Sequence, residues 1–198
     1  SASGPRTRRA DPVHFFDLGV DNQLGQRFNM LISDRSGEAC DGARKNTQLL
    51  YKLEELQMAD CVCFLLDAGK LTNIETRAGY KRKFRETIRA LNDNGVIPPE
   101  AKIEVLVTKL DKLQRKGVDA DALEEVARYE ADLRSEFVDK VEASGVYQVC
   151  ALPRANLASG VVGPSEMIER WCTSELPVDL RSLPVANAAR YLDRFLEA

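Results

Sequence analysis

The strongest constraint on the fold is a six-residue apolar run, Cys61 to Leu66, which is bounded by Asp60 and Asp67. Its residues do not alternate with polar ones, which is typical of a strand buried on both faces of a parallel sheet. A charged segment with helical character follows, roughly Thr76 to Asn94, and then a second apolar run, Ile103 to Val107. Strands that alternate with helices predict a parallel sheet built from βαβ units.

The same alternation continues on both sides of this unit. Val13 to Val20 and Phe28 to Ser33 are rich in β-forming residues and are joined by turn residues, which predicts an antiparallel hairpin. Downstream, a helix is expected near Ala120 to Ala143 and a third buried strand at Val146 to Ala151. We therefore expect an α/β fold with an open, mostly parallel sheet, helices on both faces and an initial hairpin.

The remaining segments complete this outline. Residues 1–12 are small, polar and basic and are expected to form a loop or switch-like tail, while residues 13–198 form one α/β domain. Leucines at helical spacing predict a helix over 46–57, and a last helix is expected over 186–197. Residues 155–164 are expected to form a loop, and the charges of segment 76–94 a solvated helix face.

Composition excludes several classes of function. The 198 residues include 28 basic and 31 acidic ones, and this nearly neutral balance gives no electrostatic basis for a nucleic acid or membrane partner. No apolar run approaches the roughly 20 residues that span a bilayer. Five cysteines without a CxxC pair predict reduced thiols in a cytoplasmic protein. A zinc site is not expected, because the one histidine, His14, lies far from the cysteines along the chain.

Polar residues follow the predicted strands, at the sheet edge where ligands of parallel sheets bind. Asp34 and Gly37 form a DxxG sequence after the second strand of the hairpin. A carboxylate at a strand end can hold Mg²⁺ through water, and a glycine allows a backbone N–H to approach a phosphate. Taken alone, the pattern is also compatible with an ordinary turn.

A second motif follows the run Ile103 to Val107, where Thr108, Lys109 and Asp111 form a TKxD sequence. A carboxylate can accept two hydrogen bonds from N1–H and the exocyclic amine of guanine, and a lysine stem can lie along the base. The strand Val146 to Ala151 ends in a small residue, and Ala151 would let backbone N–H groups reach a base carbonyl.

Taken in order, the segments DRSGE, ADCVCFLLDAGKL and IEVLVTKLDKL and the strand ending at Ala151 resemble P-loop GTPases. The chain looks like a TRAFAC-type GTPase domain, and more particularly like the bacterial double-GTPase domains of conflict and signalling systems. The resemblance covers roughly residues 6 to 155.

The resemblance implies GTP or GDP and Mg²⁺ as cofactors. Asp34 and Thr7 would serve the metal, and Gly37 would sense the γ-phosphate, while Thr108, Lys109, Asp111 and Ala151 would form the guanine site. Glu38 stands where many relatives place a water-orienting glutamine. A carboxylate there would repel the γ-phosphate, so slow hydrolysis is expected.

A phosphate-binding P-loop, GxxxxGK[ST], is missing from the sequence. The first strand that would precede it is missing as well, and it belongs between the strand ending at Asp34 and the strand starting at Cys61. We expect an upstream segment of a larger protein, or a partner chain, to fill that place. The alternative is a degenerate GTPase-like domain.

Three functions follow from these observations. The favoured one is a guanine-nucleotide-binding switch with slow GTP hydrolysis, as part of a larger protein. The second is a nucleotide-free pseudo-GTPase that acts as an interaction module. The third is a von Willebrand A-like metal-dependent adhesion domain, because the segment from Asp34 to Glu38 partly matches its DxSxS motif, although Glu38 replaces the second serine.

Overall fold

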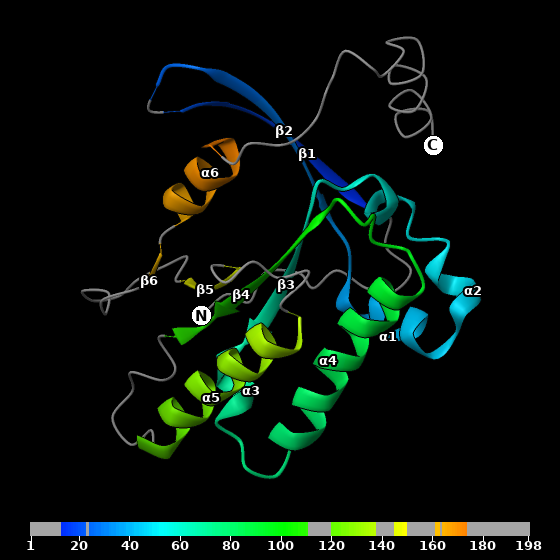
Figure 1. Ribbon diagram of the computed structural model, residues 1–198, viewed down its shortest axis with the longest axis vertical. Coiled ribbons are helices and arrows are strands. Elements are labelled where there is room, and N and C mark those ends of the chain that lie inside the picture. Colours follow the sequence, from blue (N-terminus) through cyan, green and yellow to red (C-terminus); the bar gives the residue numbers. More distant parts are fainter. Residues whose placement is uncertain are drawn as a thin grey trace.

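The computed structural model describes residues 13–22, 24–110, 120–137, 145–149, 161–162 and 164–173 (Figure 1). Their elements, in chain order, are β1 (His14–Asp21), β2 (Arg27–Asp34), α1 (Gly37–Lys45), α2 (Thr47–Leu50), the 3₁₀ helix η1 (Glu54–Met58), β3 (Cys61–Asp67), α3 (Ala68–Leu71), α4 (Arg77–Asp93), β4 (Lys102–Thr108), α5 (Ala120–Glu136), β5 (Val146–Val149), β6 (Val161–Val162) and α6 (Pro164–Thr173).

Four strands form a parallel sheet in the order β3-β4-β5-β6, which is also their order along the chain. The β3–β4 ladder runs from Cys61↔Lys102 to Asp67↔Thr108, so both strands end at the same level. Strand β5 continues the sheet through Val105↔Val146. The predicted α/β class and its parallel sheet are confirmed.

Helices cover both faces of this sheet, as predicted. Helices α4 and α5 lie on one face and α6 on the other (Figure 1). The core under α4 and α5 is built from alternate residues of β3 and β4 together with the apolar stripes of both helices, because successive side chains of a strand point to opposite faces. Its members include Val62, Leu66, Ile103, Val105, Val107, Ile88, Leu91, Val126, Tyr129 and Leu133. On the other face, Leu106 and Val149 of the sheet pack with Met167 of α6.

The predicted hairpin is also confirmed, and β1 pairs with β2 from His14↔Asp34 to Asp21↔Arg27. The turn depends on Asn22, whose side-chain oxygen accepts hydrogen bonds from the backbone N–H groups of Leu24 (3.0 Å) and Gln26 (2.9 Å). Gly25 supplies the positive φ of 73° that the turn requires. In the described residues, this hairpin is a two-stranded sheet separate from β3–β6.

Several predicted elements differ from the structure. The prediction of a single helix over 46–57 is wrong, because this segment forms α2 and η1 instead. Leu50 of α2 and Leu53, which precedes η1, are nevertheless buried in the core. The expected loop over 155–164 contains β6, a two-residue strand beside β5. The helix expected over 186–197 and the end of the one expected over 120–143 lie outside the described residues.

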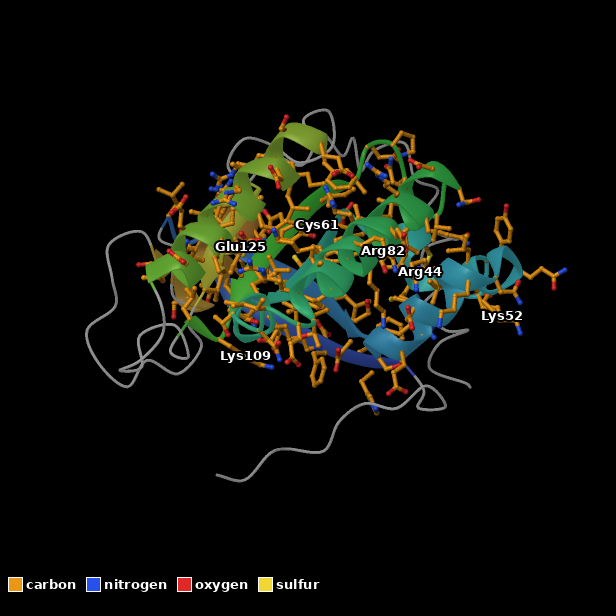
Figure 2. All side chains as sticks on the ribbon, turned by 90° about the horizontal axis from the view of Figure 1, so that it is seen from below. Arg44, Lys52, Cys61, Arg82, Lys109 and Glu125 are labelled. Carbon is orange, nitrogen blue, oxygen red and sulfur yellow. The ribbon has the colours of Figure 1, made fainter. Side chains whose placement is uncertain are left out.

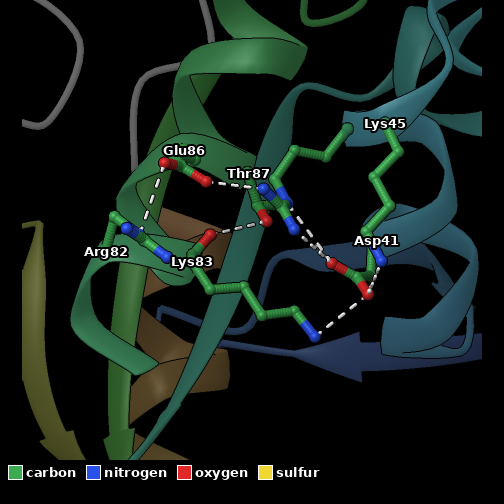
Figure 3. Close-up of polar contacts among 7 residues, drawn as sticks. Asp41, Lys45, Arg82, Lys83, Glu86 and Thr87 are labelled. Carbon is green, nitrogen blue, oxygen red and sulfur yellow. Dashed lines mark hydrogen bonds and ion pairs between the residues drawn. The ribbon is translucent and has the colours of Figure 1, made fainter. Parts of the chain in front are cut away.

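The charged face of α4 is more than a solvated surface, because part of it binds α1 (Figure 3). Asp41 of α1 pairs with Lys83 of α4 at 3.1 Å, and Arg44 pairs with Glu86 at 2.5 Å. Arg44 also binds Asp41 at 3.0 Å, so the four charges form one network between the helices.

Among the described helices, none combines the length and apolarity of a membrane span.

Candidate functional site

The best-defined polar cluster lies where β3 and β4 end. Because Asp67 and Thr108 are register partners, the residue after Thr108 can reach back across the ladder. The ammonium group of Lys109 lies 2.5 Å from Oδ2 of Asp67. The Thr108 hydroxyl donates to the backbone carbonyl of Leu66 at 3.3 Å, so both residues of the TK pair are tied to β3.

Asp67 is fixed from several sides. Its Oδ1 accepts a hydrogen bond from the backbone N–H of Gly69 at 3.0 Å and so caps α3. Its own backbone N–H donates to the Tyr80 hydroxyl of α4 at 2.8 Å. Burial, and in addition the nearby charge of Asp67, raises the pKa of Tyr80, so this phenol stays protonated and neutral near pH 7. The Lys70 ammonium lies 5.0 Å from the centre of the same ring.

Lys109 has a left-handed backbone conformation, with a φ of 60°. For a residue other than glycine this conformation costs about 1–3 kcal/mol and is concentrated at functional sites. The conformation turns the chain sharply after β4, while the half-exposed lysine side chain remains at the rim of the molecule (Figure 2). A lysine held in this way can present its aliphatic stem to a flat ring and keep its charge on Asp67.

The DxxG segment forms the connection from β2 to α1. Asp34 is the last residue of β2, and Gly37 and Glu38 open α1, with all three exposed. A Cβ added at Gly37 would meet no atom of the described residues within 4 Å, which leaves room beside this backbone within that part of the chain. An exposed carboxylate at a strand end suits a hydrated divalent cation, so Asp34 fits the magnesium role in chemistry.

Two residues inside the DxxG segment hold it in place. The guanidinium group of Arg35 makes a bidentate pair with the buried carboxylate of Glu55 in η1, through Nε to Oε1 and through Nη2 to Oε2 at 2.9 Å. The Ser36 hydroxyl accepts a hydrogen bond from the backbone N–H of Ala39 at 3.3 Å, which caps the first turn of α1. The segment is therefore anchored to the body of the domain.

The structure brings some predicted site residues together and leaves others apart. Thr108 and Lys109 gather around Asp67, whereas Asp34, Gly37 and Glu38 share the β2–α1 connection of the other sheet. Thr7, Asp111 and Ala151 lie outside the described residues.

Sequence reasoning missed Asp67, Tyr80 and the Arg35–Glu55 pair. The sequence did hold a signal for Asp67, because this residue directly follows an apolar run, just as Asp34 and Thr108 do. The others depend on tertiary contacts between residues that are distant along the chain.

Comparison with known proteins adds one match. A family model described as Double-GTPase 2 matches residues 1–172, which is most of the chain and includes every residue of the candidate site. No curated protein matches the chain.

Proposed function

The chain belongs to the Double-GTPase 2 family, and on this premise we propose that it is a guanine-nucleotide-binding switch domain that hydrolyses GTP slowly within a larger protein. Membership makes the chain a GTPase-like domain and implies guanine-nucleotide binding. The switch role, the slow hydrolysis, the cytoplasmic location and a place in a bacterial conflict or signalling system belong to the proposal.

The observation that carries the proposal is the geometry of Lys109. Its left-handed backbone at the end of β4 and its pair with Asp67 give a rigid turn with an accessible lysine stem. In the sequence, Asp111 follows two residues later and supplies the carboxylate that guanine N1–H and the exocyclic amine require. Ala151, after β5, is proposed to leave room for backbone N–H groups at the base carbonyl.

The phosphate end of the site is assigned to the β2–α1 connection. Asp34 and, from the amino-terminal segment, Thr7 would hold Mg²⁺, which neutralises the charge on the phosphates when it is bound. The open space beside Gly37 supports an approach of its backbone N–H to the γ-phosphate. Glu38 would orient the attacking water, and its charge would repel the γ-phosphate, so hydrolysis is expected to be slow.

One further strand is part of the proposal. Within the described residues, β3 has a ladder partner on one side only, and β2 pairs with β1 alone. A strand edge without a ladder partner is a template for pairing with a further strand, which supports an additional strand against these edges. We expect an upstream segment of the protein, or a partner chain, to supply this strand together with the phosphate-binding loop.

The base assignment is tested by Asp111→Asn in the full-length protein. The variant should lose GTP affinity by about ten- to a hundredfold, because it loses a charge-assisted pair worth about 1.5–3 kcal/mol. It should gain affinity for xanthosine triphosphate, whose 2-oxo group needs a donor. Asp121→Asn, at the exposed start of α5, is the matched control and should change neither affinity. Equal binding of ATP and GTP by the wild type would contradict the assignment.

The metal assignment is tested by Asp34→Asn. The variant should bind nucleotide with a weakened dependence on Mg²⁺ while its circular dichroism spectrum stays unchanged, since Asp34 is exposed. Asp93→Asn, at the exposed end of α4, serves as the control. An unchanged Mg²⁺ titration in Asp34→Asn would remove this residue from the site.

A nucleotide-free interaction module is the second candidate function. It is favoured by the exposed apolar side chains of the hairpin, among them Phe16 and Leu31. Failure of the full-length wild type to bind any guanine nucleotide would support this candidate over the switch.

A further inference from the structure

Two cysteines and one glutamate converge on the face of the sheet that α6 covers. Cys61 and Cys63 are two residues apart on β3 and therefore share a face, and Glu104 of β4 is the register partner of Cys63. The two Sγ atoms lie 3.8 Å apart, and the Sγ atom of Cys63 lies 3.8 Å from Oε2 of Glu104. All three ligand atoms lie within 4.8 Å of one another.

This cluster is separate from the proposed nucleotide site. It lies at the start of β3 and β4, whereas Asp67 and Lys109 lie where these strands end. Cys63 and Asp67 are four residues apart on one strand, which corresponds to about 13 Å. In Figure 2, Lys109 lies at the rim of the molecule and Cys61 toward the middle of the view.

Two of the three distances in the cluster are close to those of a zinc site, and the third, between Cys61 and Glu104, is within 4.8 Å. A Zn–S bond of about 2.3 Å and a tetrahedral angle place two thiolate sulfurs about 3.8 Å apart. A Zn–O bond of about 2.0–2.2 Å places a carboxylate oxygen about 3.5–3.7 Å from each sulfur. The Cys63–Glu104 distance exceeds this value by only a few tenths of an ångström. Side-chain rotations of up to about 1 Å, mainly between Cys61 and Glu104, would close the site around an ion.

Glu104 is already held in position for this role. Only 6% of the residue is exposed, and its Oε2 accepts a hydrogen bond from the indole N–H of Trp171 at 2.8 Å. Nε of Arg170 lies 3.9 Å from Oε1. Carboxylates that bind metals are commonly oriented by such outer hydrogen bonds. Two thiolates, one carboxylate and a divalent cation leave one negative charge, and Arg170 balances it.

The ligand types select the ion. Thiolates prefer zinc and other soft cations, whereas Mg²⁺ and Ca²⁺ prefer ligand sets made of oxygen alone. Both cysteines are partly exposed, so water can occupy a fourth position. We propose that Cys61, Cys63 and Glu104 bind one Zn²⁺ ion. This differs from the sequence-based expectation of no zinc site, which considered histidines and CxxC pairs but not a CxC strand beside a glutamate.

The test is a zinc titration of the full chain under a thiol-free reductant, in competition with a chromogenic chelator. Wild type should bind one Zn²⁺ per chain, and Co²⁺ in its place should give a thiolate-to-cobalt charge-transfer band. Cys63→Ser and Glu104→Gln should each lower zinc affinity by at least about tenfold. Cys40→Ser, a partly buried cysteine of α1 outside the cluster, should leave it unchanged.

A second variant keeps the proposal testable if the ligand variants fail to fold, because it leaves all three proposed metal ligands in place. Trp171→Phe keeps an aromatic ring at this position of α6 but removes the indole N–H that donates to Glu104. Zinc affinity should therefore fall by about tenfold. The proposal is overturned if the wild type binds no stoichiometric zinc. It is equally overturned if Cys40→Ser loses as much affinity as Cys63→Ser, since the metal would then bind thiols without selection.

Discussion

The hairpin β1–β2 and the strand β4 differ in burial although both are rich in β-forming residues. The five central residues of β4 are buried, whereas seven of the eight residues of β1 are exposed. Strand β4 has α4 and α5 on one face and α6 on the other, so its apolar side chains pack into a core on both faces. The comparison shows that burial by helices, rather than strand propensity, decides where the stability of this domain resides.

The hairpin is held together by other means. Its ladder is continuous over eight register pairs, and Asn22 organises its turn through side-chain hydrogen bonds. Isolated two-stranded sheets are marginal in water. The hairpin is therefore expected to open more easily than the β3–β6 sheet. Two of the three pairs of variants below test this difference, and the third tests the helix contacts that bury β4.

The largest effect is expected for matched leucine truncations in the two regions. Leu66→Ala removes a side chain with 0% exposure from the core and should lower the free energy of unfolding by about 2–5 kcal/mol. Leu31→Ala, on the exposed side of the hairpin, should cost less than about 1 kcal/mol. Urea unfolding measures both values, and equal costs would show that the hairpin is as firmly packed as the core.

An intermediate effect is expected for the charged contact between α4 and α5. Lys81 binds the buried carboxylate of Glu125 and lies 4.9 Å from the centre of the Tyr129 ring. Lys81→Met should cost about 1–3 kcal/mol, because Glu125 loses its principal partner while it stays buried. Arg82→Met, which removes the exposed neighbouring pair with Glu86, should cost no more than about 0.5 kcal/mol.

The same pair predicts a dependence on pH. The hydrogen bond from Lys81 lowers the pKa of Glu125 below its ordinary value, even though burial opposes this shift. The stabilisation is therefore present above the unfolded pKa, near 4.3, and is lost as the pH falls through the lower, folded value. The stability difference between wild type and Lys81→Met should shrink between pH 6 and pH 3. A constant difference would show that charge is not its cause.

The smallest effect compares two glycines with a positive φ. Gly25 of the hairpin (φ 73°) and Gly95 after α4 (φ 65°) both have open space where a Cβ would lie, so alanine adds only backbone strain of about 1–2 kcal/mol. Gly95→Ala should lower global stability by that amount. Gly25→Ala should instead speed hydrogen exchange within the hairpin and leave the global transition almost unchanged. A full global cost from Gly25→Ala would show that the two regions unfold as one unit.

The sequence predicts the strands well because their signal is local. The apolar runs of β3 and β4 need no tertiary information to be recognised. The sequence does not predict α1, because its residues, from Gly37 to Lys45, contain few apolar side chains and begin inside a DxxG pattern that equally predicts a turn. Its anchors are the Arg35–Glu55 pair and the contacts of Asp41 and Arg44 with α4, which the sequence alone does not reveal.

In the candidate site, too, the sequence predicts residues from local patterns but does not reveal their tertiary contacts. Thr108 and Lys109 were predicted from their place after a strand, but the partner of Lys109 depends on the β3–β4 register across 42 residues. A shift of one residue would turn Asp67 to the opposite face and abolish the pair. The cluster of Cys63 and Glu104 follows from the same register. Local patterns therefore predict which residues lie at strand ends, and the register decides which of them meet.

The order of strands in the parallel sheet, β3-β4-β5-β6, has a consequence for synthesis of the chain. A ribosome releases the chain from its amino terminus, at about 5–20 residues per second. Each of β4, β5 and β6 thus emerges after the strand beside which it lies, and none has to enter between two strands that are already paired. The sheet can grow at one edge while translation proceeds, and each step closes a loop only to the preceding strand, which limits the entropy lost at each addition.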